Sequence, residues 1–161
     1  MNLKDFYEVI PKLPGVRVYQ FSDSFESSQD LSDFAKIKDF ELEIVTFNDD
    51  IFNKLKELKD ENIRVRKIDE DKERYNLRQA QYDTVFVNLD IRKLKNLEEF
   101  LRKIYRMMKN AANIVLPVKA EDKDMIRDLL GKCNYVAIND TELDKERIVF
   151  IAKKLHGWEK V

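Results

Sequence analysis

The chain has 161 residues, of which 43% are apolar, enough to build a buried core. Its 30 basic and 31 acidic side chains nearly cancel, so charge gives no general reason to expect a nucleic acid or an anionic membrane as partner. One cysteine, one histidine and three glycines exclude an internal disulfide, a multi-cysteine or histidine-cluster metal site, and the Walker and GxGxxG phosphate loops. We expect a single domain over residues 1–161 that holds no metal.

The first half of the chain alternates between strand and helix patterns. Residues 1–13 have the apolar spacing of a short amphipathic helix, which the following prolines and Gly15 end. Runs rich in β-branched and aromatic residues predict strands at 16–21, 40–47 and 63–68. Apolar residues with a 3.6-residue period predict helices around 31–37 and 51–58, and a further short helix is predicted at 72–80.

The second half continues this alternation and then breaks it. Strands are predicted at 82–89 and 113–118, and helices at 94–109 and 123–131, the last with Gly131 as its C-cap. Two more strands, at 135–138 and 148–152, are joined by a link too short for a crossover helix, so we expect them to run antiparallel. The order predicts a doubly wound α/β fold with a mostly parallel seven-stranded sheet and an antiparallel last strand. Ligands of such sheets bind at the carboxyl ends of the strands.

Three motifs in the second half of the chain carry a family resemblance. Residues 82–90 (YDTVFVNLD) place an aromatic-aspartate pair before an apolar run with a polar end. Residues 97–109 (LEEFLRKIYRMMK) follow as a helix, and residues 148–154 (IVFIAKK) close the sheet. These motifs, with the order of elements, resemble the class I S-adenosylmethionine-dependent methyltransferases. The resemblance implies a Rossmann-like fold whose C-terminal strand is antiparallel.

The turn after the first strand departs from that family. The family binds S-adenosylmethionine with a glycine-rich turn there, because only glycine allows a close backbone approach and a positive φ. Residues 21–26 (FSDSFE) contain no glycine, and Phe21, Phe25 and Glu26 would intrude on the cofactor site. The Pro-Gly-Gly turn that often precedes the family's fifth strand is replaced by residues 110–112 (NAA). We therefore expect no cofactor.

Polar residues nonetheless stand at the strand ends where the family holds its cofactor. Ser22 and Asp23 follow the first strand. The resemblance implies that Asp49, after the second strand, would hold the ribose, and that Asp69, after the third, would meet the adenine. Asn88 ends the fourth strand, beside the usual active site. These five are the cofactor-binding candidates if the site is retained, although Asp, Asn and Ser are also ordinary turn and cap residues. No catalytic residue is assigned.

Three functions fit these features. The first is a methyltransferase-like domain that has lost cofactor binding and catalysis and acts as a binding or assembly module. The second is an active S-adenosylmethionine-dependent methyltransferase with an unusual cofactor loop. The third is an unrelated doubly wound domain of receiver-like or flavodoxin-like type, which the terminal strand pair disfavours because those folds end in a helix.

The expected partners are proteins. Arg64 and Arg66 mark the third strand as an exposed edge, and Trp158 lies in the C-terminal segment, so a homodimer or a protein partner is predicted. The basic helix at 94–109 is interrupted by Glu98 and Glu99, which favours a solvated face over a nucleic-acid site. The start of the chain lacks the apolar core of a signal peptide, and no stretch is apolar enough to cross a membrane, so a cytoplasmic protein is expected. Cys133 is expected to be buried, not paired with His156.

Overall fold

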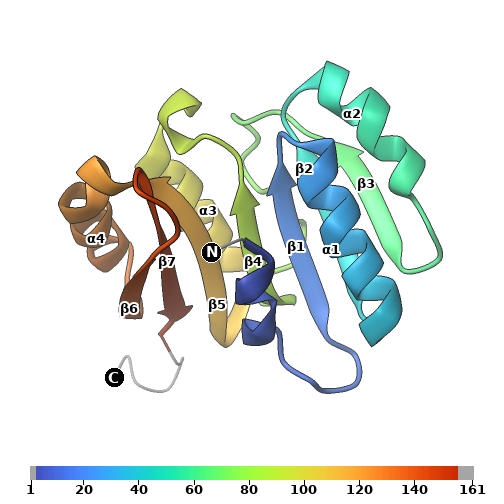
Figure 1. Ribbon diagram of the computed structural model, residues 1–161, viewed down its shortest axis with the longest axis horizontal. Coiled ribbons are helices and arrows are strands. Elements are labelled where there is room, and N and C mark those ends of the chain that lie inside the picture. Colours follow the sequence, from blue (N-terminus) through green and yellow to red (C-terminus); the bar gives the residue numbers. More distant parts are fainter. Residues whose placement is uncertain (1–2, 156–161) are drawn as a thin grey trace.

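The sheet has seven strands, one of which runs antiparallel to the others. A computed structural model describes residues 3–155 and is drawn in Figure 1. The strands are β1 (Arg17–Ser22), β2 (Glu41–Thr46), β3 (Ile63–Lys67), β4 (Tyr82–Asn88), β5 (Met108–Lys119), β6 (Tyr135–Glu142) and β7 (Arg147–Lys154). Their order across the sheet is β3-β2-β1-β4-β5-β7-β6, and β7 runs antiparallel to both of its neighbours while the other pairs are parallel. The predicted seven-stranded, mostly parallel sheet with an antiparallel last strand is therefore confirmed.

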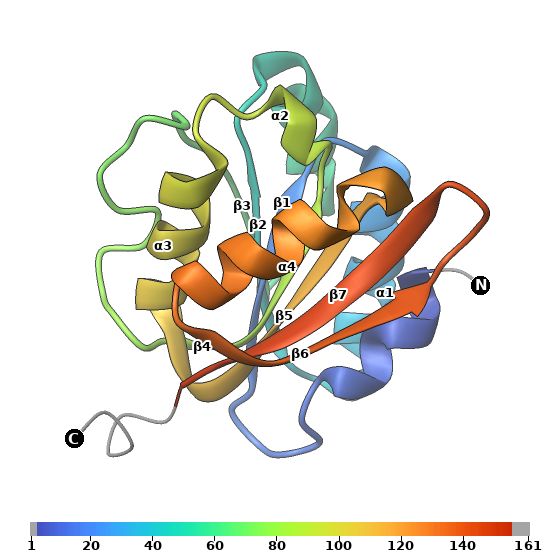
Figure 2. The ribbon, with the colours of Figure 1, turned by 90° about the vertical axis from the view of Figure 1, so that its left-hand side faces the viewer.

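Helices cover both faces of the sheet. The α-helices are α1 (Phe25–Lys38), α2 (Asp49–Leu55), α3 (Leu97–Met107) and α4 (Lys123–Lys132). α1 and α2 pack on one face with the 3₁₀ helix Leu3–Val9, whereas α3 and α4 pack on the other (Figures 1 and 2). This 3₁₀ helix replaces the longer amphipathic helix expected at 1–13. The predicted edge position of β3 is confirmed, and Arg64 is exposed there.

Local caps set where the helices begin. Ser24, Asn48 and Asn96 are the N-caps of α1, α2 and α3, and each side chain accepts a hydrogen bond from a backbone N–H of the first turn. The expected glycine cap of α4 is wrong. Gly131 lies inside the helix, and Asn134 has the left-handed backbone, with φ of 74°. Asparagine tolerates this conformation because its short polar side chain bonds locally.

The connection between β3 and β4 is the main departure from the predicted fold. Residues 69–81 contain no helix, although a short one is expected at 72–80. Tyr75 is only 2% exposed, and its carbonyl oxygen accepts hydrogen bonds from the Tyr19 hydroxyl (3.2 Å) and the Arg66 guanidinium (3.1 Å). Its own hydroxyl donates to the Glu70 carbonyl, to which Lys103 Nζ also donates. These tertiary bonds use the backbone groups of the segment and override its weak helical preference.

The buried thiol of Cys133 is expected to be unreactive in the native protein. Its side chain is 1% exposed, and burial raises the pKa of the thiol, so the reactive thiolate is scarce. Iodoacetamide at about pH 8 should modify the folded protein slowly and the urea-unfolded protein completely. Mass spectrometry measures the adduct, and Cys133→Ala supplies the unlabelled control. Equal labelling rates in both states would contradict the burial. His156 and Trp158 lie outside the described residues.

Within residues 3–155, no helix has both the length and the apolar character needed to cross a bilayer.

Candidate functional site

A pocket of about 350 Å³ opens at the carboxyl ends of β1, β4 and β5. These strand ends lie along the upper edge of the sheet in Figure 1. β1 and β4 are adjacent strands from the two halves of the chain, so the pocket lies where the strand order reverses, the usual ligand position in open α/β sheets. Its lining includes two of the predicted site residues, Asp23 and Asn88, whereas Ser22 is buried beside the lining residue Ser24.

The turn between β1 and α1 is bonded to the end of β4. The Asp23 N–H donates to the Asn88 carbonyl at 3.2 Å, and the Asp23 carboxylate accepts from the Asp90 N–H at 3.2 Å. The Ser24 N–H donates to Ser22 Oγ at 3.2 Å. Two backbone N–H groups of this turn, which face a ligand in anion-binding turns, are therefore satisfied within the protein.

Under this turn lies a network of buried polar side chains. Ser28 Oγ is 2.8 Å from Gln20 Oε1 and 2.7 Å from Ser22 Oγ. Gln20 Nε2 donates to Asn88 Oδ1 at 2.7 Å. Gln20, Ser22 and Ser28 are each at most 1% exposed, so the network satisfies groups that would be costly to bury alone. Ser22 and Asn88 thus have a structural role in joining α1, β1 and β4.

The other two predicted residues lie apart from the pocket. Asp69 accepts a hydrogen bond from Lys67 Nζ at 3.0 Å, and the Asp49 carboxylate is 3.8 Å from the same nitrogen. The bond from Lys67 holds the pKa of the Asp69 carboxyl below its usual range. Neither aspartate lines the pocket, and both are exposed at the ends of β2 and β3. The structure therefore divides the five candidates into one group around Asn88 and another around Lys67.

Four aromatic rings pack together near the ends of β1 and β2. They belong to Phe21, Phe47, Tyr75 and Phe100, and every pair among them has ring centroids 4.9 to 6.2 Å apart. Phe21 comes from β1, Phe47 directly follows β2, and Phe100 comes from α3. Such distances are typical of favourable aromatic pairs. This four-ring cluster belongs to the core on the α3 side of the sheet.

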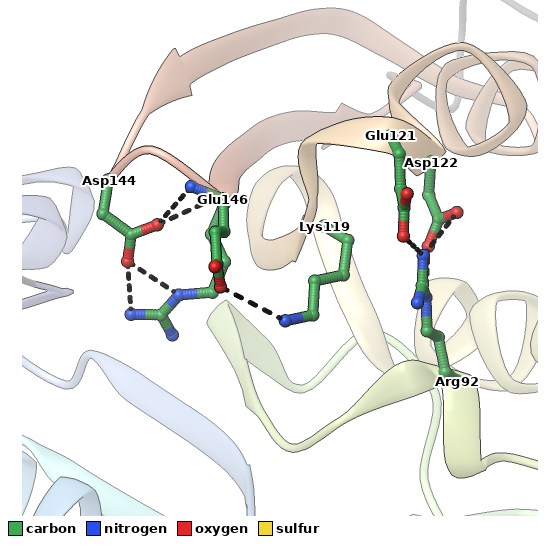
Figure 3. Close-up of polar contacts among 7 residues, drawn as sticks. Arg92, Lys119, Glu121, Asp122, Asp144 and Glu146 are labelled. Atoms are coloured by element: carbon green, nitrogen blue, oxygen red, sulfur yellow. Dashed lines mark hydrogen bonds and ion pairs between the residues drawn. The ribbon is translucent and has the colours of Figure 1, made fainter.

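Charged residues form the outer rim of the pocket. Figure 3 shows that Arg92 forms ion pairs with Glu121 and Asp122. It also shows Lys119 pairing with Glu146, which lies in the link between β6 and β7. The hydrogen bonds from Arg92 hold the pKa of the Asp122 carboxyl below its usual range. None of these residues is among the five cofactor-binding candidates predicted from the sequence. The rim residues come from the connection after β4, from the end of β5 and the turn that follows it, and from the link between β6 and β7, and no motif links them.

In the described part of the chain, no three histidine, cysteine or carboxylate side chains gather in a way that could hold a metal ion.

Neither a protein-family model nor a curated protein sequence matches this chain. Solved structures match it in fold. A SAM-dependent methyltransferase from Aquifex aeolicus aligns over 94% of this chain and 89% of its own, with 14% identity and a TM-score of 0.79. A second, from Mesorhizobium loti, aligns over 93% of this chain and 96% of its own, with 11% identity and a TM-score of 0.72. Phosphoethanolamine N-methyltransferase 2 of Haemonchus contortus, solved with S-adenosyl-L-methionine, aligns over 96% of this chain and 51% of its own, with 14% identity and a TM-score of 0.76.

These likenesses define the class of fold. The chain has the Rossmann-like fold of the S-adenosylmethionine-dependent methyltransferases, and the resemblance noted in its sequence is confirmed at that level. It matches some of these proteins over nearly their whole length and others over about half. At identities of 11 to 14% the likeness extends to the fold alone.

Proposed function

We propose that this chain is a methyltransferase-fold domain that does not bind S-adenosylmethionine and acts as a protein-binding or assembly module. The observation that carries the proposal is the closed turn between β1 and α1. Asp23 bonds to both Asn88 and Asp90. The resemblance implies a glycine-rich cofactor turn at this place. A ligand at this place would have to break these bonds.

The end of β2 supports the same proposal. A ribose-holding carboxylate is expected there, but Phe47 occupies the position and packs into the four-ring cluster. The nearest candidate, Asp49, is the first residue of α2 and is paired with Lys67. The 350 Å³ pocket extends toward β5 and the β6–β7 hairpin and has no lining residue from β2 or β3. These residues do not supply the ribose-binding carboxylate that the cofactor needs, which supports a domain that does not bind it.

We expect S-adenosylmethionine and S-adenosylhomocysteine to leave the thermal unfolding of the protein unchanged. A ligand that binds only the folded state at a hundredfold excess over its Kd stabilises it by about 2.7 kcal/mol, which a melting curve detects easily. Phosphoethanolamine N-methyltransferase 2 of Haemonchus contortus, solved with S-adenosyl-L-methionine, serves as the positive control. Isothermal calorimetry on the same samples measures any weaker binding.

The alternative function is an active methyltransferase with an unusual cofactor loop. The pocket favours it, because Asn88 and Asp90 stand at its base beside the usual active site of the fold. A clear shift with S-adenosylmethionine would overturn our proposal in favour of this alternative. In that case Asp23→Ala should reduce the shift, whereas Asp124→Ala, an exposed change on α4 away from the pocket, should not.

A further inference from the structure

Most arginines of this chain are neutralised by a neighbouring carboxylate. All ten lie within residues 3–155, and six of them form ion pairs. The four that have no acidic partner among the described residues are Arg64, Arg74, Arg78 and Arg106. The chain has 31 acidic side chains, enough to pair with every arginine, so the four arginines without a partner in residues 3–155 show that its charges are unevenly distributed.

Three of these four arginines surround one shallow depression. Arg74 and Arg78 come from the irregular segment 69–81, and Arg106 comes from the last turn of α3. Lys103, one turn earlier on α3, lines the same depression. The two elements run side by side in Figure 2, and the Ala80 N–H donates to the Arg106 carbonyl at 3.0 Å. We call Arg74, Arg78 and Arg106 the basic patch; Lys103 is buried beneath them and pairs with Glu99.

Buried contacts hold the segment that carries Arg74 and Arg78 in place. Tyr75 is buried, and its carbonyl accepts hydrogen bonds from Tyr19 and Arg66. Lys103 Nζ donates to the Glu70 carbonyl and lies 5.0 Å from the centre of the Tyr75 ring. The backbone bearing Arg74 and Arg78 is therefore ordered before any partner arrives, which lowers the entropy cost of binding.

An exposed apolar residue lies between the two arginines of the segment. Leu77 is 81% exposed, the highest value among the large apolar side chains of the described chain. An unpaired cation on each side of an exposed leucine matches a partner that alternates carboxylates with apolar residues. Arginine binds carboxylates through a planar fork of donors, so three arginines favour such a partner over a diffuse negative field.

We infer that the basic patch and Leu77 form a docking surface for an acidic, partly apolar segment of another protein. This inference rests on the proposed function as a binding module and names its partner class. The patch is less suited to nucleic acid. The one aromatic residue lining the depression, Tyr75, is buried and cannot stack on a base.

Fluorescence anisotropy with a labelled peptide of repeated Glu-Glu-Leu units tests the inference. We expect saturable binding that weakens as salt concentration rises, because the charges are exposed. The triple variant Arg74→Ala/Arg78→Ala/Arg106→Ala should weaken it about tenfold. Arg64→Ala, which removes the unpaired arginine outside the patch, should change it less than about twofold. All three patch arginines are exposed, and circular dichroism checks that the variants remain folded.

Each of three results would overturn the inference: no binding of the acidic peptide, unchanged binding by the triple variant, or tighter binding of a single-stranded oligouridylate than of the peptide. A peptide with lysine in place of glutamate controls for apolar adhesion and should not bind. The melting curve with S-adenosylmethionine is recorded on the same wild-type sample. If the acidic peptide does not bind, the melting curve still tests separately whether the protein binds S-adenosylmethionine.

Discussion

Raising the pH above about 10 is expected to unfold this protein steeply. Four tyrosines, Tyr19, Tyr75, Tyr82 and Tyr135, are at most 3% exposed, and burial raises the pKa of each phenol above its usual value. Because the folded-state pKa values are raised, this contribution to stability is complete below the unfolded value of about 10 and is lost as pH rises toward the folded values. Because these four phenols ionise only in the unfolded chain, they alone lower stability by about 5 kcal/mol per pH unit in that window.

Phenolate absorbance and far-ultraviolet circular dichroism, followed in one alkaline titration, measure this effect. The two signals should change together, since these phenols ionise only when the chain unfolds. Tyr19→Phe keeps the buried ring and removes one ionisable group, so the slope of stability against pH should fall by about 1.4 kcal/mol per pH unit. Phenolate formation near pH 10 by all tyrosines with unchanged circular dichroism would show that the four rings are accessible, contrary to the structure.

Phe21→Ala is expected to lower the free energy of unfolding by about 3–5 kcal/mol. The Phe21 ring is fully buried and contacts Tyr19, Phe47, Tyr75 and Phe100, so its removal leaves a cavity that rigid neighbours cannot fill. Against a typical stability of about 5–15 kcal/mol, this is a large share. The loss is measured by urea denaturation.

Two further variants make this measurement specific. Leu77→Ala removes an exposed side chain of similar apolar character and should change stability by less than about 0.5 kcal/mol. Phe21→Leu keeps part of the volume and should lie between alanine and the wild type. A loss below about 1 kcal/mol for Phe21→Ala would mean that the four-ring cluster is not close-packed.

The fold could be predicted from sequence because local patterns and chain order agree. Apolar runs such as 85–87 identified buried parallel strands, and the short link after β6 required an antiparallel return. The segment 69–81 could not be predicted in the same way. Its conformation depends on Tyr19, Arg66 and Lys103, which come from β1, β3 and α3, and no local pattern reports such contacts.

The candidate site was predictable only in part. Ser22, Asp23 and Asn88 could be placed together because the ends of neighbouring parallel strands meet, and they do meet. Asp49 and Asp69 also stand at strand ends, but both lie beside Lys67, away from the pocket. The missing glycines were visible in the sequence, whereas the bonds that Asp23 makes to the end of β4 follow from three-dimensional geometry alone.

The position of β7 has a consequence for the growing chain on the ribosome. β7 is the last of the seven described strands to be synthesised, yet it lies between β5 and β6 and bonds to both. A nascent chain that lacks residues 147–154 leaves β5 with an unpaired edge along the interior of the sheet, and β6 has no neighbour at all. Exposed edges of this kind pair readily with other chains. The sheet cannot close during synthesis of its first six strands, so a pause or truncation before residue 147 exposes the chain to aggregation.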